Sequence, residues 1–77
     1  GIIDLLAVKG DEAIILDYKF TSLKNDDDLV KRYKRQMFFY AYAVENVLKK
    51  RVKEVWLVNI YAGRAVKVDF DDETNKV

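Results

Sequence analysis

Two short apolar segments near the start of the chain, joined by a glycine turn, constrain the fold more than any other feature of the sequence. Residues 2–8 and 13–19 are apolar runs with the composition and length of strands. Between them, Gly10 and Asp11 fit a two-residue type II′ loop, whose first central residue needs the positive φ that glycine adopts easily. This part of the chain therefore predicts a β-hairpin.

The predicted loop also determines which residues lie opposite each other in the hairpin. The expected pairs are Lys9 with Glu12, Asp4 with Asp17, and Ile2 with Lys19. Like charges directly opposite each other destabilise a sheet by up to about 1 kcal/mol. Because the two aspartates are also flanked by apolar residues, we expect a partner that neutralises them.

A divalent cation is the natural partner for this pair of carboxylates. Mg²⁺, or Mn²⁺, prefers oxygen ligands, and Mg²⁺ is usually held by only one or two protein carboxylates. Residues two apart on a strand share a face, so Lys19 would point where Asp17 points, and its ammonium could orient or deprotonate a water. The alternative is a cross-strand salt bridge of Asp4, Asp17 and Lys19 on the solvent face of the hairpin.

The remaining sequence predicts one long helix followed by two more strands. Acidic residues at 26–28 suit the positive end of a helix dipole, and a helix over 27–50 would bury a stripe of residues at three- and four-residue spacing. That stripe consists of Leu29, Tyr33, Met37, Tyr40, Ala41, Val44, Val47 and Leu48. Strands are expected at 53–61 and 65–70, and a frayed tail at 71–77.

Together these elements predict an α+β fold, close to α/β, in one domain over residues 1–70. A mixed sheet would combine the hairpin with the second strand pair, and the long helix would pack against it. The chain has 77 residues, begins without methionine and contains no proline. We interpret it as part of a longer protein, because a chain of this size buries only a small core.

Composition excludes several kinds of chemistry. The chain has neither histidine nor cysteine, so Ser–His catalysis, thiolate zinc sites and disulfides are excluded, and catalysis would have to use Asp, Glu, Lys and Tyr. The longest apolar run, residues 37–44, is far shorter than the ~20 residues that span a bilayer. Nothing points to an oxidising compartment, so we expect a cytoplasmic protein.

The predicted helix carries three further groups of interest. Tyr33, Gln36 and Tyr40 would line one side of it, either as part of a site or as ordinary packing with one satisfied amide. The basic residues are Lys31, Arg32, Lys34 and Arg35, which would contact DNA phosphates or form a solvated face. A net charge of +1 argues against strong DNA binding by this chain alone.

Aromatic residues also lie on the side of the helix away from the stripe. These are Phe38, Phe39 and Tyr42, and an exposed aromatic patch of this kind favours association with a partner. We therefore expect the isolated chain to self-associate or to exchange elements between copies.

These motifs resemble, in order and spacing, those of the RecB-like nucleases of the PD-(D/E)XK superfamily. Gly1-Ile2-Ile3-Asp4 is similar to the family's G-x-x-D motif, Asp17-Tyr18-Lys19 to its D-Y-K motif, and the Gln36 to Tyr40 segment to its Q-x-x-x-Y motif. Residues 32–45 and 52–55 are particularly similar to the C-terminal nuclease domain found in AddAB-type helicase–nucleases. The resemblance covers roughly residues 1–68.

The resemblance implies a restriction-endonuclease-like core, without its first helix, and metal-dependent hydrolysis of DNA phosphodiester bonds. It implies these roles: Asp4, Asp17 and the carbonyl of Tyr18 as ligands of Mg²⁺ or Mn²⁺, Lys19 as the catalytic lysine, Gln36 and Tyr40 as further active-site residues. Tyr33, Arg32 and Arg35 would contact DNA. The family commonly has Thr or Ser where this chain has Phe20, and it takes another acidic ligand from the helix that is absent here.

The resemblance further implies DNA end processing in recombinational repair, together with an ATP-driven helicase and a second protein of the complex. The isolated chain is expected to bind metal better than it cuts DNA. Two alternatives remain: a non-catalytic DNA-binding or assembly module with the nuclease fold, and a structural domain whose carboxylates are salt-bridged.

Overall fold

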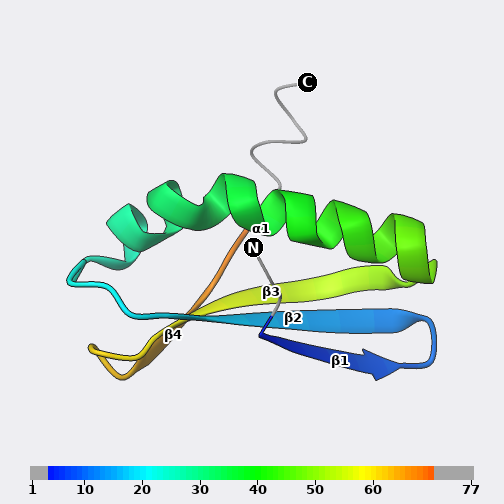
Figure 1. The fold of residues 1–77 in the computed structure, drawn as a ribbon, viewed down its shortest axis with the longest axis horizontal. Coiled ribbons are helices and arrows are strands. Elements are labelled where there is room, and N and C mark those ends of the chain that lie inside the picture. Colours follow the sequence, from blue (N-terminus) through cyan, green and yellow to red (C-terminus); the bar gives the residue numbers. More distant parts are fainter. Residues whose placement is uncertain (1–3, 71–77) are drawn as a thin grey trace.

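A mixed four-stranded sheet with one long helix across one face makes up the computed structural model, which describes residues 4–70 (Figure 1). The elements are β1 (Leu5–Lys9), β2 (Glu12–Lys19), α1 (Asp26–Leu48), β3 (Arg51–Asn59) and β4 (Arg64–Lys67). The strands lie in the order β1-β2-β3-β4, and only the β2–β3 pair is parallel. Helix α1 is the crossover that a parallel pair requires. The predicted α+β fold with a mixed sheet is confirmed.

The β1–β2 hairpin has the predicted register. Gly10 has a φ of +62°, and the pairs run from Lys9 with Glu12 to Leu5 with Leu16. Asp4 directly precedes β1, so it lies at the next position along the hairpin, beside Asp17. The predicted pairing of Ile2 with Lys19 lies outside the described residues, as does the predicted tail at 71–77.

The start of α1 is stabilised by its flanking asparagine. The side-chain oxygen of Asn25 accepts hydrogen bonds from the amides of Asp27 and Asp28, at 2.8 and 3.3 Å. Asparagine is among the best residues at this position because it satisfies amides that have no partner within the helix. The three acidic residues fill the first turn, as predicted from the helix dipole.

The predicted end of the helix is wrong. Helix α1 ends at Leu48 rather than at residue 50, because Lys49 adopts a left-handed conformation with a φ of 57°. Val47 and Leu48, which were predicted to be buried, are 76% and 43% exposed. At this end of the sheet β2 and β3 begin with the charged residues Glu12 and Arg51.

The second strand pair also has different boundaries from those predicted. Strand β3 begins two residues earlier, because Arg51 pairs with Glu12 in the parallel ladder and its amide donates to the Asp11 carbonyl at 2.7 Å. Strand β4 ends at Lys67, three residues before the predicted end. The amide of Val68 nevertheless continues the hydrogen bonding, to the carbonyl of Val55 at 2.8 Å.

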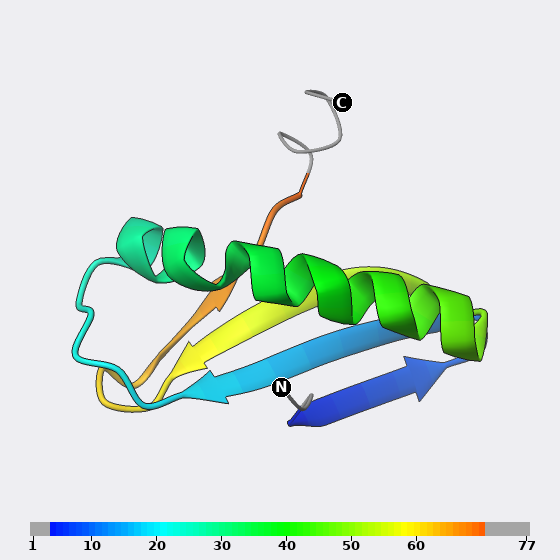
Figure 2. The ribbon, with the colours of Figure 1, turned by 45° about the horizontal axis from the view of Figure 1, so that its top comes forward.

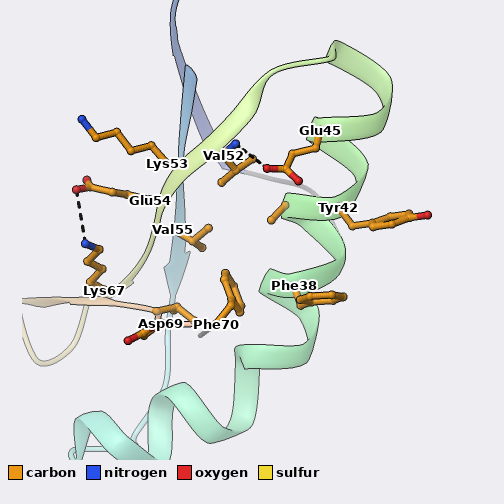
Figure 3. Close-up of a pocket in the computed structure, with 12 residues that line it drawn as sticks. Phe38, Tyr42, Glu45, Val52, Lys53, Glu54, Val55, Lys67, Asp69 and Phe70 are labelled. Carbon is orange, nitrogen blue, oxygen red and sulfur yellow. Dashed lines mark hydrogen bonds and ion pairs between the residues drawn. The ribbon is translucent and has the colours of Figure 1, made fainter. Parts of the chain in front are cut away.

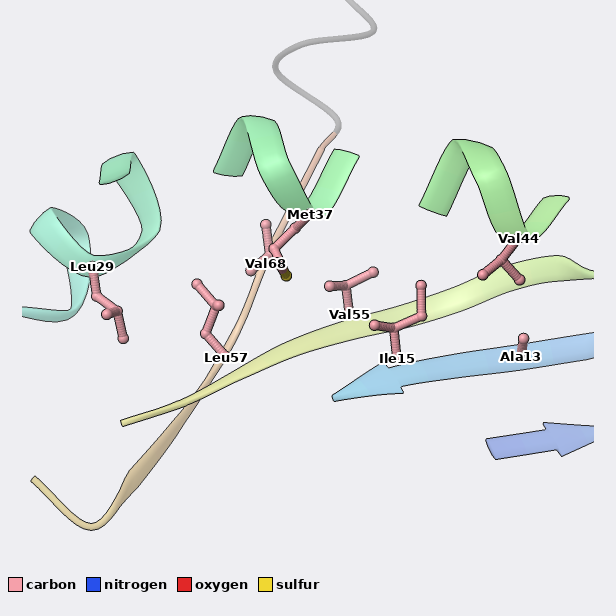
Figure 4. Close-up of a cluster of buried hydrophobic side chains, with 8 residues drawn as sticks. All are labelled: Ala13, Ile15, Leu29, Met37, Val44, Val55, Leu57 and Val68. Carbon is pink, nitrogen blue, oxygen red and sulfur yellow. The ribbon is translucent and has the colours of Figure 1, made fainter. Parts of the chain in front are cut away.

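The hydrophobic core lies between α1 and the sheet (Figure 4). Its buried members are Ala13, Ile15, Leu29, Met37, Val44, Val55, Leu57 and Val68. Alternate residues of β2 and β3 face α1, as expected for strands, whose successive side chains point to opposite sides. Because the same alternation places Asp17 and Lys19 on the helix side, they lie at the edge of this core rather than on an open sheet face.

Aromatic side chains lie on the outer side of α1, as predicted. Phe38, Phe39 and Tyr42 are 41%, 59% and 61% exposed. A cleft of about 720 Å³ opens between the C-terminal half of α1 and the start of β3, and both Phe38 and Phe70 line it (Figure 3). No helix in the described part of the chain is long and apolar enough to cross a membrane.

Candidate functional site

Two carboxylates meet where β1 begins and β2 approaches its end. Asp17 is only 2% exposed, whereas Asp4 is exposed. Asp4 Oδ2 accepts a hydrogen bond from the amide of Tyr18 at 2.8 Å. Because the N–H and C=O of a strand residue point to the same side, the Tyr18 carbonyl also points toward β1. The two predicted acidic ligands and the predicted main-chain ligand therefore lie together.

The ammonium of Lys19 lies in a fixed set of contacts between β2 and α1. Its Nζ is 2.8 Å from Asp17 Oδ2 and donates a hydrogen bond to Gln36 Oε1 at 2.7 Å. It also lies 4.4 Å from the centre of the Tyr33 ring, a distance at which a cation is attracted to the ring face. The side chain of Lys19 is only 16% exposed, so these contacts largely replace water.

The two carboxyl groups titrate in opposite directions. The pKa of Asp4 is lowered, mainly by a hydrogen bond from the Asp17 side chain and then by the amide of Tyr18. The pKa of Asp17 is raised, first by burial, and the ion pair with Lys19 only partly offsets this. Burial thus opposes ionisation of the inner carboxyl group, whereas the contacts of the outer one favour its ionisation, as expected for two carboxyl groups that share a site.

These carboxylates fit a divalent cation. Asp17 Oδ2 is buried, and its close cationic partner within residues 4–70 is the Lys19 ammonium at 2.8 Å. Asp4, Asp17 and the Tyr18 carbonyl provide oxygen ligands alone, which is the preference of Mg²⁺ and Mn²⁺. The described residues contain no cluster of three or more acidic, histidine or cysteine side chains.

The salt-bridge alternative is correct for one pair of its three residues, Asp17 and Lys19, which both belong to β2, and it is wrong in its location. Lys19 and Asp17 do form an ion pair, but it lies beneath α1 rather than on a solvent face. An ion pair in such a place loses much of its Coulombic gain to desolvation, so it is weak evidence for a purely stabilising role.

Some of the predicted site residues on α1 contact Lys19, and others do not. Gln36 and Tyr33 contact Lys19 directly. The pKa of Tyr40 is raised, first by burial and then by the negative charge of Asp17. The Arg32 guanidinium lies 5.7 Å from the centre of the Tyr33 ring. Arg35 is exposed and faces solvent.

Sequence reasoning did not single out Asn59. It is 3% exposed and pairs with Lys19 in the parallel ladder. Its Nδ2 donates to the carbonyl of Leu23 at 2.8 Å, and its Oδ1 accepts from the amide of Ala62 at 3.2 Å. Asn59 therefore holds the loop that joins Lys19 to α1. The signal in the sequence was a single amide side chain within an apolar strand.

Comparisons with known proteins agree on one family. The family model described as the PD-(D/E)XK nuclease superfamily matches residues 1–77. Relatives named as the A component of an ATP-dependent helicase/nuclease include those of Ligilactobacillus salivarius (38% identical over 86% of this chain), Clostridium acetobutylicum (37% over 90%) and Desulforudis audaxviator (40% over 84%). The chain spans only 5–6% of the length of these relatives.

Proposed function

Because this chain belongs to the PD-(D/E)XK nuclease superfamily, we propose that it is the metal-dependent DNA-cleaving module of a helicase–nuclease. The observation that carries the proposal is the ammonium of Lys19, which is held at once by the buried Asp17 and by Gln36 of α1. A lysine fixed beside two carboxylates is suited to phosphodiester hydrolysis, in which negative charge develops on the phosphate.

Asp4, Asp17 and the carbonyl of Tyr18 would hold Mg²⁺ or Mn²⁺. When bound, such a cation lowers the pKa of a coordinated water and offsets charge on the phosphate. The amide of Tyr18 orients the Asp4 carboxylate from the neighbouring strand, so this ligand is positioned before a cation arrives.

The other side chains act on the substrate and on Lys19. Gln36 accepts a hydrogen bond from Lys19 and so fixes the direction of the ammonium, which would donate to the attacking water or to a phosphate oxygen. The phenol of Tyr40, whose pKa is raised by burial, is protonated at neutral pH and would donate a hydrogen bond to DNA. Arg32, Arg35 and Tyr33 would contact the DNA backbone next to this group.

The wider role follows from the names of the relatives, which join a nuclease to an ATP-dependent helicase. We place this chain in a cytoplasmic complex with a second protein component, which together process DNA ends in recombinational repair. The complete set of Asp4, Asp17 and Lys19 favours catalysis over a non-catalytic assembly module, because a site without selection for cleavage would be expected to lose at least one of them.

Metal titration tests the proposed site. We expect millimolar Mg²⁺ or Mn²⁺ to raise the thermal midpoint of this chain by several degrees, since a ligand at 100 times its Kd stabilises by about 2.7 kcal/mol. Asp17→Asn should remove the shift, and in the full-length protein it should stop DNA degradation. The measurement is thermal unfolding followed by circular dichroism, with and without chelator.

The shift should also depend on pH. The pKa of Asp17 in the fold lies above its usual 3.8, so its protonated form favours the fold, and metal-free stability falls as the pH rises through the raised value. A cation must displace this proton, so the metal-induced shift should shrink as the pH falls through the same value. A thermal midpoint that does not change with metal, or that changes equally in wild type and in Asp17→Asn, would contradict the proposed site.

We also propose that the isolated chain self-associates through the aromatic side of α1. Phe39 and Tyr42 are more than half exposed beside the cleft that Phe38 lines. Sedimentation velocity at increasing concentration should show dimers or larger species, and Phe39→Ser with Tyr42→Ser should shift the chain toward monomer. A clean monomer at high concentration would overturn this expectation.

A further inference from the structure

Two exposed aromatic rings meet at the end of the sheet that carries Lys19. Phe20 is 71% exposed and Tyr61 is 75% exposed, yet their ring centres are only 5.6 Å apart, with the planes at 72°. Phe20 directly follows β2 and Tyr61 lies in the turn after β3. Because β2 and β3 are parallel, both rings lie at the carboxyl ends of neighbouring strands, where the loop to α1 and the β3–β4 turn come together (Figure 2).

Core packing does not account for this pair. Neither ring is among the described residues of the hydrophobic core or those packed against it, and the two rings are in edge-to-face contact. In an edge-to-face pair, the ring that presents its edge keeps both of its faces open, and its partner keeps one. At the exposures measured, these faces are in contact with water. Aromatic faces in water are surfaces on which a flat, apolar ligand can stack.

The position of the pair relative to the carboxylates limits what that ligand is. Phe20 is three residues beyond Asp17, which corresponds to about 10 Å along a strand at roughly 3.3 Å per residue. One strand of DNA advances about 3.4 Å per nucleotide. Phe20 directly follows Lys19, so the rings lie at the same end of β2 as the proposed catalytic group, and a short stretch of one DNA strand would reach both.

The surface next to the rings suits a charged strand. A hollow of about 380 Å³ beside Tyr61 has a mixed lining of apolar, polar and basic residues, the basic ones being Lys24 and Arg64. The Arg64 guanidinium is held in place by the carbonyl of Lys24 at 2.7 Å and by Asp26 at 2.6 Å. Basic groups beside an aromatic stacking surface are the usual combination in proteins that bind single strands.

We propose that Phe20 and Tyr61 form a nucleobase-binding subsite, on which an unpaired base next to the scissile phosphate stacks. The proposal rests on the nuclease function proposed above and adds the residues that select an unpaired strand. Bases within a duplex are stacked on each other and present only their edges in the grooves, so they cannot lie on these rings. Only a strand with a displaced base can use the pair.

Binding of three DNA probes to the 77-residue chain tests the subsite, in chelator so that no cleavage occurs. The probes are a fluorescent oligothymidylate, an abasic strand of equal length and a duplex. By fluorescence anisotropy, wild type should prefer the oligothymidylate. Phe20→Ala and Tyr61→Ala should each weaken its binding by roughly 5- to 100-fold, the range of one lost stacking contact, and leave abasic binding unchanged.

Matched variants separate stacking from other effects. Phe20→Trp keeps a ring and should retain binding, whereas Phe20→Leu keeps apolar volume without a ring and should lose it while the circular dichroism spectrum stays unchanged. Tyr42→Ala removes an aromatic of similar exposure, 61%, from the outer side of α1 and should have no effect.

Two outcomes would contradict the proposed subsite. Wild-type binding that is equal for oligothymidylate and abasic strands, or ring variants that bind like wild type, would overturn the subsite. The nuclease proposal is tested separately, by measuring DNA degradation by Lys19→Ala. If that variant still cleaves DNA while the ring variants lose base-dependent binding, the subsite stands as a DNA-binding feature and the catalytic assignment does not.

Discussion

Lys19→Ala in the full-length protein should reduce DNA degradation by roughly 10²- to 10⁴-fold, the contribution typical of a positioned acid–base or charge-stabilising group. The substitution removes an ammonium that lies 2.8 Å from Asp17 and 2.7 Å from Gln36, and no other cation within residues 4–70 lies in that set of contacts. ATP hydrolysis should stay unchanged, because the proposed helicase function would lie outside these residues. Release of labelled nucleotides and of inorganic phosphate measures the two activities in one preparation.

Two companion variants make this result specific to the site. Lys53→Ala removes an exposed lysine from β3, away from the carboxylates, and should leave both activities intact. Gln36→Ala leaves the ammonium in place but without its fixed direction, so we expect a smaller loss than for Lys19→Ala. If Lys19→Ala degrades DNA at the wild-type rate, the catalytic assignment of Lys19 is wrong.

Leu57→Ala should cause the largest loss of stability among single core truncations at this strand. Leu57 is 0% exposed, on β3 between α1 and the sheet. Truncation of a buried leucine costs about 2–5 kcal/mol, whereas a domain of this length has roughly 4–12 kcal/mol in total. The thermal midpoint should therefore fall by roughly 10–30 °C, or the chain should fail to fold. Thermal unfolding by circular dichroism measures the change.

Val47→Ala is the matched control for this prediction. The sequence pattern placed Val47 in the buried stripe, but its side chain is 76% exposed at the end of α1. Its truncation should change the free energy of unfolding by no more than about 0.5 kcal/mol, the usual range for a surface substitution. A loss comparable to that of Leu57→Ala would mean that the last turn of α1 is covered in solution, for example by a second copy.

Local signals predicted the hairpin and the body of the helix correctly. The turn at Gly10 determines the register over a few residues, and no distant contact is needed to explain it. The ends of α1 and β3 depend instead on tertiary pairing. Arg51 is an unremarkable charged residue in the sequence, and it is in a strand only because it lies beside Glu12 across a parallel ladder. Local propensity carries no information about such a neighbour.

Only part of the site could be predicted, because some of its contacts follow from local sequence and others depend on tertiary pairing. The face shared by Asp17 and Lys19 follows from the alternation of a strand, and the position of Asp4 follows from the turn. The contact between Lys19 and Gln36 depends on how α1 crosses the sheet, which helical spacing alone does not determine. The role of Asn59 depends on the parallel pairing of β2 and β3, which brings together residues 40 positions apart.

The hydrogen bond from the Tyr18 amide to Asp4 joins a backbone N–H group to a carboxylate of the proposed metal site. The amide proton of Tyr18 points at one oxygen of a carboxylate that would bind a cation. The chemical shift of this proton and its rate of exchange with solvent therefore depend on the charge and position of Asp4. One backbone resonance, visible in a two-dimensional nitrogen–proton spectrum, thus serves as an internal probe of the site. It allows occupancy to be followed without DNA, without turnover and without any label beyond nitrogen-15.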